Sequence, residues 1–358
     1  MNTRFSLPFL GTALAITTTV IAIAGTKDRT LDIYWVDSQG GGSTLIVTPA
    51  DESLLIDTGN PGGRDSGRIH AVATTVAGLK RIDHLVTTHF HIDHFGGAAE
   101  LAALMPIGTV YDNGLPERDP DNGTDPTWPL KSRGYREMKC EHRVLAQPGA
   151  PIPLHVLSSG PTLSATFLAA REQFVRIVGS KGAIAECSDP APKPIDTSDN
   201  RNSIATLVQF GKFRFYDGGD MTWNTEAALA CPGGRFGPVD VFQVNHHGLD
   251  ISNNPLLLRA LAPTVAVFNN GPHKGGALAV ATNLRALPTL RAVYQVHRNL
   301  DSAPANSPSA FIANDNEAGG KWLKLSVAAD GLTYIVTVPS TAHSATYRTQ
   351  ERSDGGGR

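Results

Sequence analysis

The residues best suited to chemistry lie in one short segment, His89-Phe-His-Ile-Asp-His94, which holds three imidazoles and one carboxylate among six residues. Imidazole nitrogen and carboxylate oxygen are donors that zinc and the neighbouring first-row divalent metals bind. In a tight loop, His89 and His91 can point to one side while Asp93 and His94 point to another. The segment therefore predicts ligands for two metal ions rather than for one.

Further side chains of the same chemical types stand elsewhere in the chain, each just after an apolar run. They are Asp57, Asp220 and the neighbouring pair His246 and His247. Strands of a layered fold deliver their ends to a common edge. We therefore expect these residues to approach the histidine-rich segment.

Alternating and apolar runs predict the strands that carry these residues. In the first half of the chain the strands are 31–36, 44–47, 53–56, 83–88 and 107–111, with helices over 64–79 and 96–105. In the second half they are 203–210, 213–216, 239–244, 264–268 and 292–296, with helices over 222–230, 254–261 and 279–286. A hairpin of 322–327 and 333–338 follows. Two halves of similar make-up predict two sheets packed face to face, with helices outside.

Two segments rich in Pro and Asp, 113–134 and 186–202, interrupt this pattern and are predicted to be surface loops. The long first loop is typical of a lid or a specificity element. Residues 135–146 are predicted to be helical.

Three motifs together resemble the signature of the metallo-β-lactamase superfamily: the segment His89–His94 with Gly96-Gly97 after it, Leu54-Leu-Ile-Asp57-Thr-Gly59 upstream, and Gly219-Asp220 downstream. They spread over residues 31 to about 300. The resemblance implies the α+β class, with a four-layer αββα metallo-β-lactamase sandwich. It implies a single domain over 28–340, and we expect 341–358 to be a disordered tail.

The resemblance also implies a role for each residue that matches the motifs. His89 and His91 bind a first metal ion, Asp93 and His94 bind a second, and Asp220 bridges the two. Asp57 is the buried acid that orients a ligand.

One expected ligand is missing from this sequence. Most superfamily members carry a histidine just before the strand that leads to the bridging aspartate, and here that position falls near Asp199 or Asn200. The first ion is then completed by a carboxylate, an amide or water.

Val244-Asn-His-His-Gly248 stands where the superfamily places its last ligand, and its His-His-Gly form resembles the competence-type (ComEC-like) subgroup and a choline-phosphate esterase. One histidine binds the second ion while the other faces the substrate, and the sequence does not decide between them. Our interpretation assigns His246 to the metal and gives Asp93, His247 and His273 catalytic roles. His273 and Lys274 lie in a Gly-rich segment after a strand, which can form a rim of donors for an oxyanion.

Two divalent ions, Zn²⁺ or else Mn²⁺ or Fe, would lower the pKa of a shared water so that hydroxide attacks the substrate. The His-His-Gly form and Lys274 favour a phosphodiester-type substrate. The alternatives are a carboxylic ester, lactone or β-lactam hydrolase, and a non-catalytic binding protein on the same fold. The sequence has no G-x-S-x-G, Walker or dinucleotide-binding glycine motif.

The N-terminus predicts export. Arg4 precedes an apolar stretch that ends at Ala22-Ile-Ala24, which fits a signal peptide of residues 1–24 and a periplasmic or secreted protein. An uncleaved membrane anchor is the alternative. A formal net charge of -2 predicts no stable nucleic-acid binding, so the expected partner is a small-molecule or polymer substrate. The three cysteines, Cys140, Cys187 and Cys231, allow one disulfide at most.

Overall fold

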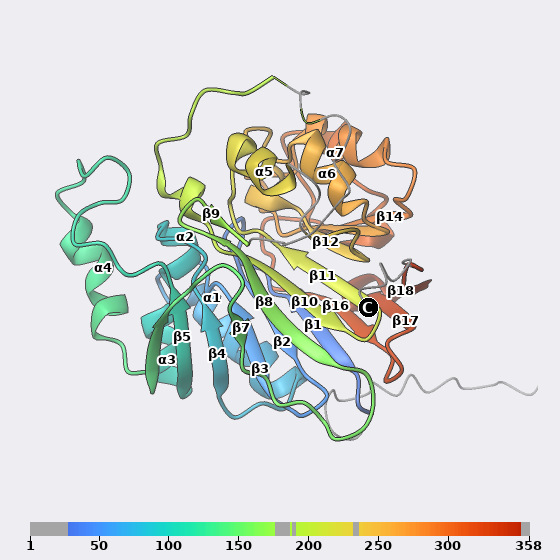
Figure 1. Ribbon diagram of the computed structural model, residues 1–358, viewed down its shortest axis with the longest axis horizontal. Helices are drawn as coiled ribbons and strands as arrows, with labels where there is room; N and C mark the ends of the chain where they lie inside the picture. The colour runs from blue at the N-terminus through green and yellow to red at the C-terminus, as the bar shows by residue number, and fades with distance from the viewer. Residues whose placement is uncertain (1–27, 176–186, 188–190, 232–235, 352–358) are drawn as a thin grey trace, which may run out of the picture.

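The computed structural model describes residues 28–175, 187, 191–231 and 236–351. Within these residues, two mixed sheets pack face to face and helices cover the outer face of each (Figure 1). This is the predicted four-layer αββα sandwich. The predicted signal peptide of residues 1–24 lies outside the described residues. No helix in the described part of the chain has the length and apolar character needed to cross a membrane.

The first sheet runs from the C-terminal strands, through the N-terminal strands, to an exposed edge. Its order is β18 (His343–Arg348), β17 (Thr333–Val338), β16 (Leu323–Val327), β1 (Leu31–Trp35), β2 (Thr44–Val47), β3 (Ser53–Ile56), β4 (Ile82–Val86), β5 (Ile107–Asp112) and β6 (His142–Leu145). The strands from β3 to β6 are parallel.

The second sheet is built from the second half of the chain. Its order is β15 (Ile312–Asn314), β14 (Ala292–His297), β13 (Val265–Phe268), β12 (Val241–Gln243), β11 (Phe213–Asp217), β10 (Ala205–Phe210), β8 (Leu163–Ala170) and β7 (Pro151–Ile152), with β9 (Gln173–Phe174) paired to β8. The strands from β11 to β15 are parallel.

Helices lie on the outer faces of both sheets. Those that cover the first sheet are α1 (Arg64–Ala71), which continues as a π-helix over Val72–Val76, α2 (Ile92–Phe95), α3 (Ala98–Leu104) and α4 (Trp128–Glu137). Those that cover the second sheet are α5 (Trp223–Ala230), α6 (Pro255–Leu261) and α7 (Leu278–Arg285). Short 3-10 helices are η2 (Asp199–Asn202), η3 (Asn245–Gly248), η4 (Ala303–Ala305), η5 (Ser309–Phe311) and η6 (Pro339–Thr341).

The strands are apolar on both faces because each face packs on another layer. In β3, Leu54 and Ile56 join the core between the sheets, whereas Leu55 joins the core under the helices. In β4, Leu85 and Val86 divide in the same way. Strand alternation thus fills two cores from one short run, which fixes the register of the strands that lead to the histidine segment.

Three predictions about local structure were wrong. The loop predicted over 113–134 ends earlier, because α4 begins at Trp128, where Trp128 and Tyr135 pack into the core. The helix predicted over 135–146 is instead the end of α4 followed by β6. The tail predicted from residue 341 contains β18, whose six residues pair with β17, so the folded domain extends beyond residue 340.

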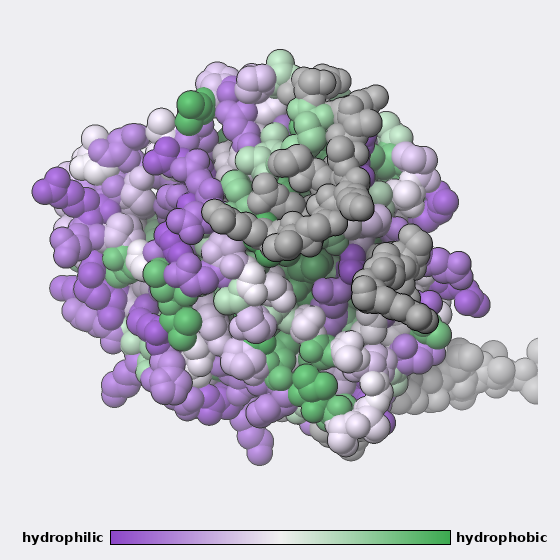
Figure 2. All heavy atoms as spheres, in the orientation of Figure 1, coloured by the Kyte–Doolittle hydropathy of each residue, from purple (hydrophilic) through white to green (hydrophobic). Residues whose placement is uncertain are grey.

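The molecule is polar on one side, and two of its three cysteines are paired. Hydrophilic residues cover the side of the molecule that carries α4 (Figure 2). Cys187 and Cys231 form a disulfide, while Cys140 is a free thiol.

Candidate metal centre

The carboxyl ends of parallel strands from both sheets meet at one edge of the sandwich. Asp57 follows β3, the segment from His89 follows β4, Asp220 follows β11, and the two histidines of η3 follow β12. The backbone N–H of Ile204, ahead of β10, donates to the carbonyl of Thr88 and ties the second sheet to the first at this edge. Strand ends are the usual place for such a site, because loops there are free to carry chemistry.

Four side chains converge at this edge so that one ligand atom from each lies within 4.8 Å of the others: Asp93, His94, Asp220 and His247. His94 Nε2 lies 3.1 Å from Asp220 Oδ2 and 3.2 Å from His247 Nε2. His247 Nε2 lies 3.3 Å from Asp220 Oδ2 and 3.5 Å from Asp93 Oδ2. Donor atoms around a tetrahedral zinc ion stand about 3.3–3.6 Å apart, given bonds of about 2.0–2.2 Å. The donor set therefore fits a divalent cation.

In both His94 and His247, Nδ1 makes a hydrogen bond within the protein and Nε2 faces the cluster. The carboxylate of Asp57 accepts from His94 Nδ1 at 2.6 Å, and the carbonyl of Asn269 accepts from His247 Nδ1 at 3.0 Å. Both acceptors require a proton on Nδ1, so in the neutral rings the Nε2 lone pairs face the cluster. Asp57 thus contacts the ring of His94, one of the residues that the resemblance implies as a ligand.

His89 follows the same rule through Thr88. The Thr88 hydroxyl donates its one proton to Asp57 Oδ2 at 2.7 Å, so it can only accept from His89 Nδ1, at 3.0 Å. His89 Nε2 is fully buried and has no partner among the described residues, at 4.0 Å from Asp220 Oδ2. An unpaired buried nitrogen costs free energy unless something binds it. This atom is therefore suited to a further cation beside Asp220.

Glycines let the backbone approach this hydrogen-bond network closely. A Cβ on Gly42 would stand 2.8 Å from both Asp57 Oδ2 and His94 Nδ1. A Cβ on Gly219 would stand 2.8 Å from Thr88 Cβ, and Gly219 also has a φ of 55°. Larger residues at either position would push these partners apart.

The electrostatics of the cluster call for positive charge. Burial would raise the pKa of Asp220, but the neighbouring His247 and His94 outweigh burial and hold that pKa well below its ordinary value. Burial would lower the pKa of His94, but Asp220 and Asp57 outweigh it and raise that pKa well above 6.5. For His89, burial dominates and the adjacent His94 adds to it, so its pKa falls well below 6.5. A proton on His94 or a bound cation would each offset the negative charge of Asp220 and Asp57.

The two histidines of η3 stand in different places. His247 belongs to the four-residue cluster, whereas His246 lies beside it, with Nε2 3.4 Å from Asp220 Oδ2 and Nδ1 3.1 Å from Ser252 Oγ. This geometry favours His247 as the ligand, the reverse of our sequence-based assignment. Both have φ near 55°, an uncommon conformation for a residue with a side chain, and it sets the directions of the two rings.

His273 does not join the site. It is half-exposed, and its two ring nitrogens pair with Asp301 at 2.8 Å and Glu317 at 3.1 Å. A catalytic role for His273 therefore has no geometric support. Its neighbour Lys274 does reach the cluster, where Nζ forms an ion pair with Asp93 Oδ2.

At the position where a histidine is expected, Asp199 makes hydrogen bonds within the protein. Asp199 accepts from the backbone N–H of Phe90 at 2.6 Å and from Asn202 Nδ2 at 2.9 Å, so both of its oxygens are engaged. Asn200 is buried, and its Oδ1 has no partner among the described residues. His91, the remaining predicted ligand, contacts Asp121 of the 113–127 segment.

Three contacts at the site were not predicted from the sequence: those of Asp121 with His91, of the Asn269 carbonyl with His247, and of Lys274 with Asp93. Asp121 lies in a Pro- and Asp-rich segment that was predicted to be a surface loop, and its composition does not distinguish Asp121 from Asp119 or Asp125. The carbonyl of Asn269 acts through the backbone, so no residue type could reveal it.

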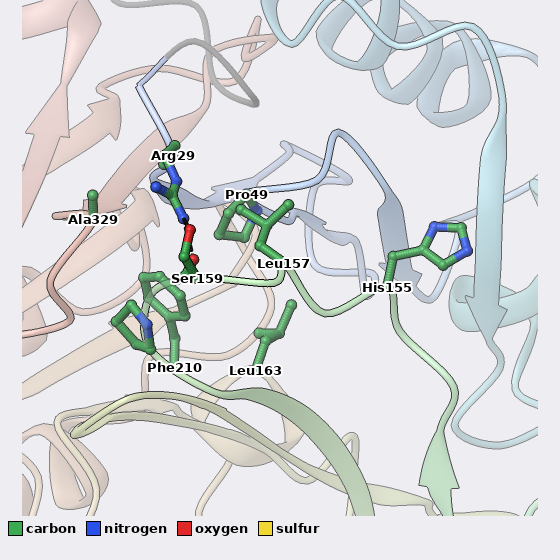
Figure 3. A pocket seen from close by; sticks show the side chains of 9 residues that line it. Arg29, Pro49, His155, Leu157, Ser159, Leu163, Phe210 and Ala329 are labelled. Carbon is green, nitrogen blue, oxygen red and sulfur yellow. Dashed lines mark hydrogen bonds between the residues drawn. The ribbon is translucent and has the colours of Figure 1, made fainter.

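A hollow in the surface lies away from this edge (Figure 3). It is lined by Arg29, Pro49, His155, Leu157, Ser159, Pro161, Leu163, Phe210 and Ala329. Leu163 pairs with Phe210 at one end of β8 and β10, whereas Thr206 pairs with Asp217 at the metal end. His155 points away from the other labelled side chains (Figure 3). This hollow is therefore separate from the metal centre.

One family model matches the first part of the chain. Residues 38–169 match the sequence model of the Metallo-beta-lactamase superfamily. The matched range includes Asp57 and His89–His94 and ends before Asp220. The competence protein ComA of Neisseria gonorrhoeae is 35% identical over 78 residues, which are 22% of this chain and 11% of that protein. The match thus concerns a small part of ComA.

Two solved structures are similar to this chain over most of its length. MEM-A1, a subclass B3 metallo-beta-lactamase isolated from a soil metagenome library, has a TM-score of 0.37 and 16% identity, over 63% of this chain and 78% of its own. CmlA, a diiron beta-hydroxylase from Streptomyces venezuelae, has a TM-score of 0.38 and 15% identity, over 78% of this chain and 49% of its own.

Proposed function

We propose that this chain, which belongs to the metallo-beta-lactamase superfamily through residues 38–169, is an exported metal-dependent hydrolase that cleaves a phosphodiester-type substrate. Export rests on the signal-like segment 1–24. The observation that carries the metal dependence is the convergence of Asp93, His94, Asp220 and His247 at distances that suit one cation. The pattern of three histidines with Nδ1 donated and Nε2 bare supports it further.

Two divalent ions would be shared among the residues of this edge. Asp93, His94 and His247 would hold one ion, His89 and His91 would hold the other, and Asp220 would lie between them. When bound, such a pair supplies a water activated for attack and neutralises charge that develops on the substrate oxygen. Zn²⁺ suits this mixture of imidazole and carboxylate, and Mn²⁺ and Fe are the alternatives.

The chain's own groups prepare the site before substrate arrives. Asp57 and Asn269 hold the Nδ1 protons of His94 and His247, so Nε2 is the nitrogen from which each ring would release a proton to bind a cation. Burial lowers the pKa of His246 to about 4, against the raising effect of Asp220, so His246 is neutral at pH 7. His246 is the imidazole left to contact the substrate, as a hydrogen-bond partner.

Lys274 supports an anionic substrate. Its side chain is 39% exposed and reaches Asp93 at the cluster. Once Asp93 binds a cation, the ammonium group beside it is placed to bind a substrate oxyanion. A neutral ester or lactone has no group that requires this cation, which favours a phosphodiester.

The test is turnover of three chromogenic substrates by protein stripped of metal and reloaded with Zn²⁺ or Mn²⁺: bis-p-nitrophenyl phosphate, a p-nitrophenyl ester and a cephalosporin. We expect phosphodiester cleavage that His247→Ala abolishes. The matched control is His273→Ala, which removes a surface histidine and should leave turnover unchanged. Lys274→Met should raise KM roughly 10- to 150-fold, since a charge-assisted hydrogen bond contributes about 1.5–3 kcal/mol.

Other outcomes would redirect the assignment. Turnover of the ester or the cephalosporin alone would replace the phosphodiester by a carboxylic ester, lactone or β-lactam. A protein that binds no divalent ion and cleaves none of the three substrates would leave a non-catalytic binding role on the same fold.

A further inference from the structure

The segment between β5 and α4 sends one carboxylate to the metal edge. Both oxygens of Asp121 lie near His91 Nε2, Oδ1 at 3.0 Å and Oδ2 at 2.9 Å. The two residues are 30 positions apart in the chain, and their side chains are 40% and 22% exposed. This contact joins the predicted specificity loop to the histidine segment.

The contact decides which nitrogen of His91 carries the proton. An ionised carboxylate only accepts hydrogen bonds, so a neutral His91 must carry its proton on Nε2 and its lone pair on Nδ1. We propose that Asp121 is a positioning residue: it holds His91 in the Nε2–H tautomer, so that Nδ1 is the atom offered to the first metal ion. This inference rests on the metal pair of the proposed function.

His91 thus uses the opposite ring nitrogen, Nε2, for its hydrogen bond within the protein. His89, His94 and His247 each donate from Nδ1 and leave Nε2 bare. A free histidine exchanges readily between its two tautomers, so a ligand that must bind through Nδ1 needs a partner on Nε2. Asp121 is the partner that the structure gives to His91 Nε2.

Asp121 is itself held in place by the loop that replaces the missing histidine. Its Oδ1 accepts from the backbone N–H of Asp199 at 2.8 Å, and Asp199 in turn accepts from the backbone N–H of Phe90 at 2.6 Å. Two carboxylates from distant loops thus brace the backbone and the ring of the His89-Phe90-His91 turn. This brace lies in the segment where the sequence lacks the expected histidine.

The inference can be tested in the metal-free protein, independently of any activity. Long-range ¹H–¹⁵N correlation spectra of ¹⁵N-labelled protein at alkaline pH report the tautomer of each histidine. We expect His91 as Nε2–H in the wild type and a mixture of tautomers in Asp121→Asn. The matched control is Asp125→Asn, because Asp125 lies in the same loop but pairs with Lys131 and Thr127. That variant should keep the wild-type spectrum of His91.

Metal titration supplies the second readout. In Asp121→Asn we expect the affinity for one of two ions to fall roughly 10- to 100-fold, the effect usual for partners of metal-bound histidines. The other ion should bind as in the wild type. Asp121→Glu, which keeps the carboxylate, should restore part of the lost affinity. A dispersed amide spectrum for each variant shows that the fold is intact.

Two results would overturn the inference. One is an unchanged His91 tautomer together with unchanged affinities in Asp121→Asn. The other is a Co²⁺ spectrum showing that this variant loses a ligand while the tautomer stays the same, which would make Asp121 a direct ligand. If the wild type takes up no ion at all, the proposed function fails, yet the tautomer spectra still decide the role of Asp121 toward His91.

Discussion

Asp57 offers the sharpest test of how the protein prepares its metal site. It lies at the end of β3 and is buried, and it accepts three hydrogen bonds: from Thr88 N at 2.8 Å, from Thr88 Oγ1 at 2.7 Å and from His94 Nδ1 at 2.6 Å. Replacement by asparagine keeps the shape of the side chain. It also adds little backbone strain, because Asp57 has a φ of 62°, a conformation that asparagine tolerates better than most residues.

An amide cannot serve the donors that the carboxylate serves. If its oxygen faces His94, its NH₂ group opposes the N–H of Thr88, which leaves two buried donors unpaired at about 1–3 kcal/mol. If its NH₂ faces His94 instead, Nδ1 must become the acceptor and the proton moves to Nε2, the atom that points at the cluster. Either arrangement weakens binding of a cation at Nε2.

We therefore expect Asp57→Asn to lower the free energy of unfolding of the metal-free protein by about 1–3 kcal/mol. We also expect the affinity for one ion to fall roughly 10- to 100-fold, or about 1.4–2.8 kcal/mol. Urea denaturation measures the first quantity, and calorimetric titration of the metal-free protein with Zn²⁺ measures the second.

Asp37 provides the matched control. It is also a buried aspartate paired to a buried histidine, with Oδ1 2.7 Å from His297 Nε2, but it contacts none of the four cluster residues. Asp37→Asn should lose stability and keep the metal affinities. Wild-type affinity for both ions in Asp57→Asn would refute the reasoning, and so would an equal loss of affinity in Asp37→Asn.

Three further perturbations test other parts of the structure. Gly42→Ala should lower stability by about 1–3 kcal/mol and weaken metal binding, because its Cβ intrudes on the Asp57–His94 contact at 2.8 Å. Burial raises the pKa of Glu226 to about 7, so between pH 4.5 and about 7 the folded protein holds a proton that the unfolded chain has lost. The free energy of unfolding therefore falls as the pH rises through that range, by about 3 kcal/mol at most. Glu226→Gln should flatten this pH dependence of urea unfolding. Cys231→Ser should lower stability by about 4 kcal/mol, since the disulfide with Cys187 spans 44 residues.

Each of these predictions has its own check. Gly67→Ala, whose Cβ meets nothing within 4 Å, should keep stability and metal binding, in contrast to Gly42→Ala. Equal pH slopes in Glu226→Gln and the wild type would show that Glu226 titrates normally. For the disulfide, a reducing agent should lower the stability of the wild type and leave that of Cys231→Ser unchanged, and any other pattern contradicts the bridge.

The sequence determined the donor inventory and the fold that carries it. His89, His91, Asp93 and His94 are close in space because they are close in the chain, and the apolar run before them is a strand because both of its faces must be buried. Asp57 and Asp220 could be placed with them because parallel strands bring their ends to one edge. Local pattern also gave most strands, but it failed at α4, where Trp128 and Tyr135 pack through a long-range core that no local signal specifies.

Only the tertiary structure decided how these donors are used. Which of His246 and His247 faces the cluster depends on the positive φ of both residues. The tautomers of His247 and His94 depend on the Asn269 carbonyl and on Asp57, which are 22 and 37 residues away in the chain. Asp121 and Lys274 reach the site from loops whose composition does not show which of their side chains turn toward it. Ring rotation, proton position and the meeting of distant loops are set by contacts across the whole fold, because a sequence specifies which atoms are available but not which of them face one another.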